Sequence, residues 1–172
     1  MAVTLKDEKI LDTWGVVMEG GAGHSASLLQ NIQSGLKDAE LPGIAWEVAD
    51  AQPGMLKGLF GKKREYLMIT NQGLKDYRMY IGSRDYGKHL DLSWFLTVEP
   101  GFFKSAFSSM LAHGNINAIS FSLDVFDTQD LRAYVTAVHH GCIIRVVQDL
   151  GRKLNLDTTH YNWQSKGSLQ VW

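Results

Sequence analysis

The sequence predicts an α+β fold: a four- to five-stranded antiparallel sheet packed by a long C-terminal helix. Two observations favour this fold class. Several segments alternate apolar and polar residues with the period of two that marks a strand with one covered face. The segment after residue 127 instead carries an apolar stripe at helical spacing, of the kind that lies across a sheet. The length of 172 residues, 45% of them apolar, fits a single domain spanning 1–172.

The first predicted helix covers residues 25–41. Leu28, Ile32 and Leu36 recur at helical spacing, and Ser25 is a suitable N-cap residue. The Leu-Pro-Gly sequence that follows ends the helix, because proline cannot continue it. The sequence also allows a short helix before Gly20. An N-terminal helical region is therefore expected ahead of all the strands.

Five segments show the alternation that predicts strands. In the fourth of them, Leu90, Leu92 and Trp94 alternate with polar residues. Gln72 and Gly73 lie between the second and third segments and predict a hairpin turn. A helix over 101–115 is expected before the last strand. The predicted strands are 43–51, 64–71, 76–82, 88–98 and 118–126.

The last helix is the clearest of the predicted elements. Asp127 or Thr128 can cap its N-terminus, and Asp130 lies in the first turn, where the helix dipole favours a carboxylate. A stripe of apolar residues then continues to the end of the helix and predicts its buried face. The stripe consists of Leu131, Val135, Val138, Cys142, Val146, Leu150 and Leu154.

Two adjacent histidines and the single cysteine lie in the middle of this helix. Successive helical residues point about 100° apart, so His139 and His140 cannot both face one metal ion. His139 and Cys142 can share a face, but two ligands do not complete a zinc site. Cys142 also falls on the apolar stripe, where a free cysteine acts as a small hydrophobe. We interpret this cluster as packed core and expect no metal.

A glycine-rich loop from Gly20 to Ser25 precedes the first clear helix. An apolar run, a glycine turn and a helix N-terminus together resemble the elements that hold phosphates. The spacing matches neither of the established phosphate-binding patterns, and the following strands are predicted to be antiparallel. A flexible connection between two helices is the preferred interpretation, with a nucleotide site as the alternative.

A basic and apolar loop is the predicted binding site. Cations beside large apolar groups can dock on an acidic partner or on anionic lipid, and a terminal tryptophan can anchor an interface. The alternative is a solvated loop whose apolar side chains fold back onto the core. The predicted binding residues are Lys57, Leu59, Phe60, Lys62, Lys63, Arg64 and Trp172.

The segment KKREYLMITNQGLKDYRMYIGSRDYGKHLDLSWFL resembles a group of uncharacterised bacterial proteins. In that group an REYL strand is followed by a strand pair and then by an SWWL-like strand. The matching residues here are Arg64, Glu65, Tyr66 and Leu67, then Ser93, Trp94, Phe95 and Leu96. The intervening hairpin is more polar in this chain. The resemblance implies a bacterial cytoplasmic module and brings no activity with it.

Composition narrows the function further. A net charge of −1 argues against a general nucleic-acid binder, and one cysteine indicates a reducing compartment. The N-terminus carries charges where a signal peptide is apolar, so we expect a cytoplasmic protein. Catalytic motifs are absent from the sequence; Asp85, His89 and Asp91 are typical of the polar face of a half-exposed strand. We therefore expect no cofactor.

The favoured hypothesis is a non-catalytic interaction module with a protein partner: an adaptor, an accessory subunit or a chaperone-like protein. One alternative is a peripheral membrane or anionic-ligand binding domain that uses the loop from Lys57 to Arg64. Another is a small nucleotide-binding enzyme that uses the loop from Gly20 to Ser25. The sequence is also compatible with a homo-oligomer through the long helix or the Trp172 tail, which follows a turn predicted at Lys166 and Gly167.

Overall fold

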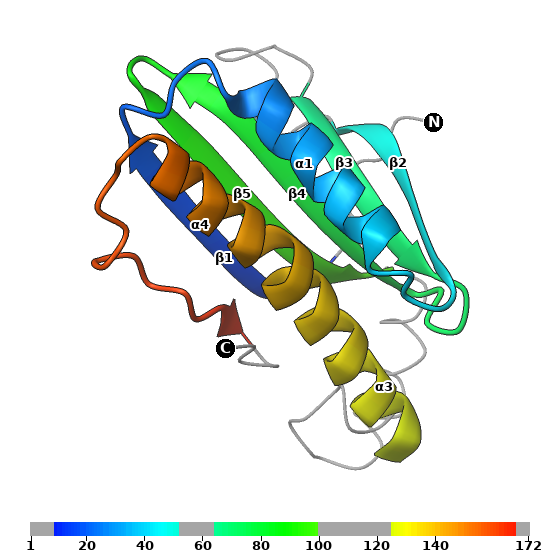
Figure 1. Ribbon diagram of the computed structural model, residues 1–172. Helices are drawn as coiled ribbons and strands as arrows, with labels where there is room; N and C mark the ends of the chain where they lie inside the picture. The colour runs from blue at the N-terminus through cyan, green and yellow to red at the C-terminus, as the bar shows by residue number, and fades with distance from the viewer. Residues whose placement is uncertain (1–8, 52–63, 100–124, 168–172) are drawn as a thin grey trace.

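A computed structural model describes residues 9–51, 64–99 and 125–167 (Figure 1). Its centre is a six-stranded antiparallel sheet with the strand order β2-β3-β4-β5-β1-β6. The α+β prediction is therefore confirmed, with more strands than the four or five expected. The elements are β1 (Lys9–Glu19), α1 (Ser25–Asp38), β2 (Ile44–Ala51), β3 (Arg64–Asn71), β4 (Tyr77–Tyr86), β5 (His89–Val98), α3 (Val125–Thr136), η1 (Ala137–Ile144), α4 (Arg145–Lys153) and β6 (Lys166–Gly167).

The main core lies between the sheet and two helical segments on one of its faces. α1 and the continuous C-terminal helix formed by α3, η1 and α4 run side by side over the strands, and α3 projects past their ends (Figure 1). The predicted alternation is seen directly on β5, where Leu90, Leu92 and Trp94 are fully buried under the helices. Leu28, Ile32 and Leu36 of α1 join the same cluster, as predicted.

The N-terminal segment is a strand, so the short helix expected before Gly20 is wrong. β1 inserts antiparallel to β5 with Trp14 opposite Trp94, and β6 pairs on its other side. Trp14, Val16 and Met18 are buried, whereas Val17 between them is 52% exposed. This alternation has the period of a strand, and burial of every second side chain stabilises the pairing.

A second, smaller apolar cluster lies on the opposite face of the sheet. Tyr66, Met68 and Tyr80 are buried there, with Phe95 packed against them. The ring of Tyr66 lies across the neighbouring strand at Gly82. A Cβ atom at Gly82 would lie 2.6 Å from the Tyr66 ring, so glycine provides the space that the aromatic side chain occupies.

The C-terminal helix is continuous but changes its geometry in the middle. Ala137–Ile144 forms a π-helix, in which hydrogen bonds join residues five apart. The buried face follows this wider turn: Cys142 is succeeded by Val147, which is fully buried, whereas the predicted Val146 is only half-buried. The predicted stripe is thus right up to Cys142 and again at Leu150, whereas Val147 replaces the predicted Val146 as the deeply buried residue, because a regular α-helical spacing does not account for the π turn.

Several predicted element ends are corrected. The N-cap of α1 is His24, and the Ser25 hydroxyl instead donates to the Ser83 carbonyl at 3.1 Å. Val125 and Phe126 begin α3, so they are not the end of a strand, and Asp127 lies in the first turn of the helix. The predicted helix 101–115 and strand residues 118–124 lie outside the described residues.

The two predicted turns have different outcomes. The turn at Gln72 and Gly73 is confirmed, and the Gly73 N–H donates to Asn71 Oδ1 at 2.8 Å. The turn predicted at Lys166 and Gly167 is wrong, because these residues form β6 beside Asp12 and Thr13 of β1. A side chain at Gly167 would collide with the β1 backbone, so this edge pairing depends on glycine.

Candidate binding pocket

The sequence-predicted binding loop lies almost entirely outside the described part of the chain. Arg64 is the first residue of β3, and only its backbone is described. The structure therefore leaves this prediction untested. The residues outside the described ranges are Lys57, Leu59, Phe60, Lys62, Lys63 and Trp172.

The glycine loop from Gly20 to Ser25 has its backbone donors engaged within the protein. Gly21 N–H donates to the Met18 carbonyl at 3.2 Å, and Ala22 N–H donates to the Lys88 carbonyl at 3.4 Å. Gly23 N–H donates to the Asp85 carboxylate at 2.9 Å. A carboxylate of the protein itself thus takes the position at which a phosphate would bind, and the preceding strand belongs to an antiparallel sheet. This arrangement gives the nucleotide hypothesis no support.

The histidine and cysteine cluster is packed core, as predicted. His139 and Cys142 are fully buried, and burial raises the pKa of the Cys142 thiol, which keeps it protonated and unreactive. The His139 ring lies against Trp14 and Trp94, with centroids 5.2 and 4.8 Å away. Among the residues that the structure describes, no group of three or more metal-ligating side chains comes together.

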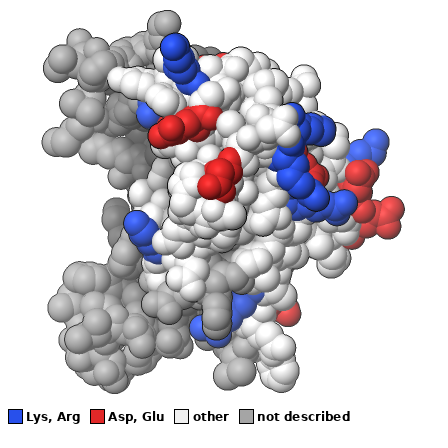
Figure 2. All heavy atoms as spheres, turned by 60° about the vertical axis from the view of Figure 1, so that its left-hand side comes forward, with Lys and Arg blue, Asp and Glu red and all other residues white. Residues whose placement is uncertain are grey.

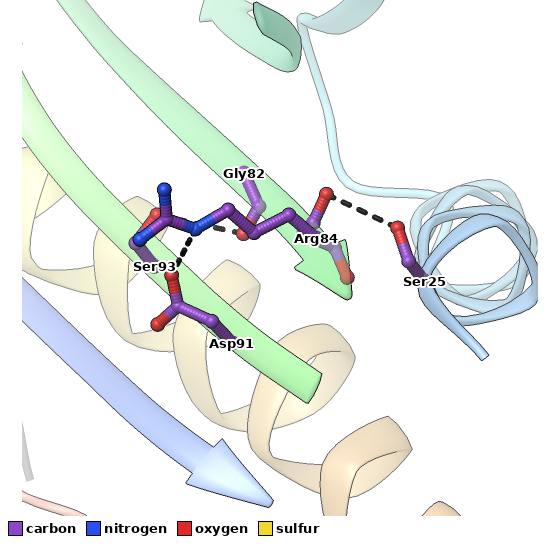
Figure 3. Close-up of polar contacts among 6 residues, drawn as sticks. Ser25, Gly82, Arg84, Asp91 and Ser93 are labelled. Carbon is purple, nitrogen blue, oxygen red and sulfur yellow. Dashed lines mark hydrogen bonds and ion pairs between the residues drawn. The ribbon is translucent and has the colours of Figure 1, made fainter. Parts of the chain in front are cut away.

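The polar groups around the β4–β5 hairpin pair with one another. Arg84 Nε donates to Asp91 Oδ2 at 2.8 Å across the two strands, and the Ser93 hydroxyl donates to the Gly82 carbonyl at 3.5 Å (Figure 3). The Arg84 guanidinium also lies over the Tyr86 ring, 5.6 Å from its centroid. These contacts engage Arg84, Asp91 and Ser93 with one another or with the backbone, whereas His89 Nδ1 is buried without a hydrogen-bonding partner among the described residues and so forms no catalytic pair with Asp91.

A pocket of about 500 Å³ opens beside α3, and we call it the α3 pocket. Its volume lies in the range of small-molecule and side-chain binding sites. Three separate parts of the fold form it: the α1–β2 connection, the β3–β4 turn and one side of α3. The lining residues are Leu41, Pro42, Ile44, Asn71, Gly73, Leu74, Asp127, Asp130, Ala133, Tyr134 and Ala137.

The α3 pocket combines apolar walls with acidic side chains. Asp127 and Asp130 are its two charged lining residues, and both come from the N-terminal turns of α3. Burial raises the pKa of Tyr134, so its phenol stays neutral, and its hydroxyl has no hydrogen-bonding partner in the described part of the protein. Phe126, which precedes Asp127 in the chain and is not a lining residue, is 76% exposed. A pocket with apolar walls and a few polar groups is typical of a recognition site.

The sequence analysis named Asp127 and Asp130 but did not predict the pocket that they line. Asp127 and Asp130 are interpreted in the sequence as capping and dipole groups of a helix, which is a sufficient local explanation for them. Their proximity to Leu41 and Leu74 arises only when α3 packs beside two connections from distant parts of the chain.

A second, smaller pocket of about 330 Å³ lies between α1 and the C-terminal helix, and its charged lining residues Asp38, Arg145, Asp149 and Lys153 are of both signs. Figure 2 shows the distribution of charge over one side of the molecule. Basic and acidic side chains are interspersed there among uncharged residues, with no face of one sign. None of the described helices combines the length and apolarity needed to cross a membrane. Comparisons with protein-family models, with curated proteins and with solved structures gave no match to the chain.

Proposed function

We propose that this protein is a non-catalytic interaction module that binds a basic and apolar segment of a protein partner in the α3 pocket. The observation that carries the proposal is the lining of this pocket: apolar walls in which both charged residues, Asp127 and Asp130, are acidic. A lysine or arginine side chain presented next to an apolar residue complements both properties of the pocket.

The chemistry of the pocket favours a protein segment as the ligand. Leu41, Ile44 and Leu74 offer apolar surface to the stem of a long side chain or to a neighbouring apolar residue. The carboxylates then meet the cationic end, and such complementarity fixes orientation and speeds association. Phe126, one residue before Asp127 in the chain, is exposed and offers an aromatic side chain to the same partner.

The state of the other polar groups supports a binding role over catalysis. Within residues 9–51, 64–99 and 125–167, three of the sequence candidates for chemistry have structural roles, and a fourth, His89, has no hydrogen-bonding partner at its buried Nδ1. Asp85 accepts from Gly23, Asp91 is paired with Arg84, and the Cys142 thiol is buried. A nucleophile next to a free general base, which hydrolytic or transfer chemistry requires, is not among them.

The test uses peptide ligands selected against the full chain. A phage-displayed library of random peptides is selected on the immobilised protein, and the affinity of the enriched peptides is measured by fluorescence anisotropy. We expect enriched sequences to carry lysine or arginine beside an aromatic or aliphatic residue. Asp130→Asn should weaken their binding about fivefold or more, the effect of losing one charge-assisted contact.

A matched pair of substitutions on α3 locates the binding site. Ala133→Arg places a long cation inside the pocket and should abolish peptide binding, whereas Thr136→Arg adds the same residue at an exposed position outside the pocket. Equal binding by both variants would refute the α3 pocket as the site. Enrichment of acidic peptides, or of small molecules but no peptides in a parallel screen, would refute the proposed partner.

A further inference from the structure

His139 is a fully buried histidine without a polar partner. It lies in the π-helical segment η1, and its exposed fraction is 0%. Neither Nδ1 nor Nε2 has a hydrogen-bonding partner in the part of the protein that the structure describes. Buried polar atoms are almost always paired in native proteins, so a side chain with two unpaired nitrogens requires an explanation. π-Helical turns are rare and are frequently found where a helix has a functional role.

The two tryptophans that enclose His139 offer it no hydrogen-bond acceptor. Trp14 Nε1 already donates to the Asn162 carbonyl at 2.8 Å, and Trp94 Nε1 is a buried donor without a partner. An indole N–H is only a donor, and a protonated imidazole carries only donors. The neutral ring of His139 therefore fits between Trp14 and Trp94 as an aromatic side chain. The protonated ring would lose its hydration without gaining hydrogen bonds to replace it.

The titratable groups around η1 do not supply a counter-charge. On β1 the buried titratable residue is Asp12, which is 1% exposed; its Oδ1 accepts from the Thr13 N–H, and its Oδ2 has no hydrogen-bonding partner among the described residues. Asp12 makes no hydrogen bond with His139 and is not among the charges that shift the pKa of His139. On β5 the helix-facing residues are apolar, and on α1 the contact with η1 is made at Gly35. Tyr134 of α3 and the η1 residues His140 and Cys142 are neutral or cationic. Arg145 at the start of α4 is cationic and exposed.

We propose that His139 is an acid-sensitive latch: the neutral ring holds η1 against β1 and β5, and protonation releases the C-terminal helix from the sheet. Burial, followed by the charge of His140, lowers the pKa of His139 from 6.5 to about 4. His139 therefore binds a proton less readily in the folded protein than in the unfolded chain. The contribution of His139 to the free energy of unfolding is fully present above pH 6.5, and it is lost as the pH falls from 6.5 toward 4.

One attraction acts in the opposite direction. A cation between two tryptophan rings gains cation–π energy, which increases when the ring is desolvated. If this gain exceeded the desolvation cost, His139 would protonate at or above pH 6.5 and the latch would not exist. The titration of His139 in the folded protein therefore decides the proposal directly.

The experiment combines that titration with unfolding at two pH values. Histidine resonances of the full chain are followed by NMR, and urea unfolding of wild type, His139→Gln and His140→Gln is measured at pH 7.5 and 5.0. Between these pH values, the unfolding equilibrium constant of wild type should rise about 30-fold more than that of His139→Gln, as linkage for a shift from 6.5 to about 4 requires. His140→Gln should keep most of the wild-type dependence.

Amide exchange distinguishes local release from a general loss of stability. When the pH is lowered to 5.0, the amide protection factors of residues 137–153 should decrease more than those of α1. The latch is wrong if His139 titrates at an ordinary or raised value, or if wild type and His139→Gln lose stability equally. Should His139→Gln not fold, the NMR titration and the exchange data on wild type still decide between these outcomes.

Discussion

Replacing Gly82 by alanine should destabilise the protein although alanine is the better strand residue. In an open strand this change gains roughly 0.5–1 kcal/mol, because glycine loses more backbone entropy on folding. At Gly82, however, the new methyl group would lie 2.6 Å from Tyr66 Cε1, far inside van der Waals contact. The ring must leave the cluster that it forms with Met68 and Tyr80. Overpacking of this kind costs about 1–3 kcal/mol, so we expect a net loss of about 1–2 kcal/mol.

The measurement is urea unfolding of Gly82→Ala, Tyr66→Leu and the double variant. If the collision with the Tyr66 ring is the cause, Gly82→Ala should be neutral or stabilising in the Tyr66→Leu background, and the coupling energy should equal about 1–3 kcal/mol. Gly82→Ala that is as stable as wild type would contradict the contact between the ring and the strand. A zero coupling energy would assign the loss to the backbone instead.

Four further predictions concern other parts of the molecule. Gly141→Ala, at an exposed helical position where an added Cβ has no neighbour within 4 Å, should raise the midpoint of thermal unfolding. Ile32→Ala should lower the free energy of unfolding by about 2–5 kcal/mol in denaturant titrations, because the side chain is fully buried. Acidification from pH 7.5 to 5.0 should lower the free energy of unfolding of wild type by about 2 kcal/mol more than that of His139→Gln. The reason is the lowered pKa of His139, because of which the unfolded chain binds a proton at this residue that the folded protein does not bind. If the predicted basic loop binds anionic lipid, charge reversal at Lys62 and Lys63 should abolish co-sedimentation with phosphatidylserine vesicles.

The strands that could be predicted are those whose alternation is uninterrupted. β5 was predicted to within one residue at its start because every second residue from Leu90 to Val98 is apolar. β3 was predicted over its full length, and its apolar residues Tyr66 to Ile69 are buried on both faces of the sheet. β1 was missed because the pattern is broken: a bulge lies between Ile10 and Asp12, and Gly15 stands in the middle. The partner of β1 is β5, about eighty residues later in the chain, and no local pattern indicates such a pairing.

In the long helix, too, the sequence pattern predicts what depends on local spacing and misses what depends on packing against distant residues. Its apolar stripe indicated the buried face correctly as far as Cys142. Cys142 lies inside the π-helical segment η1, where His139 packs between two tryptophans and where a Cβ at Gly35 of α1 would lie 3.7 Å from Cys142. The regular helical spacing does not include this wider turn, so it predicted Val146 where Val147 is the deeply buried residue, although Leu150 is buried as predicted.

The α3 pocket could not be predicted for a related reason. Its acidic residues have a local explanation in the helix dipole, and its apolar walls read as ordinary core and turn residues. Only the packing of α3 beside the α1–β2 connection and the β3–β4 turn gives these side chains a shared surface. Recognition sites made of single residues from several elements have no sequence signature of their own.

The binding of a basic and apolar segment in the α3 pocket is tested most directly by an amide chemical-shift map of the protein with a selected peptide. The account predicts that the perturbed amides concentrate at Leu41, Ile44, Leu74 and residues 127–137, and that Ala133→Arg removes the perturbations. Perturbations confined to other surfaces, such as the β4–β5 hairpin or the outer side of α4, would contradict it.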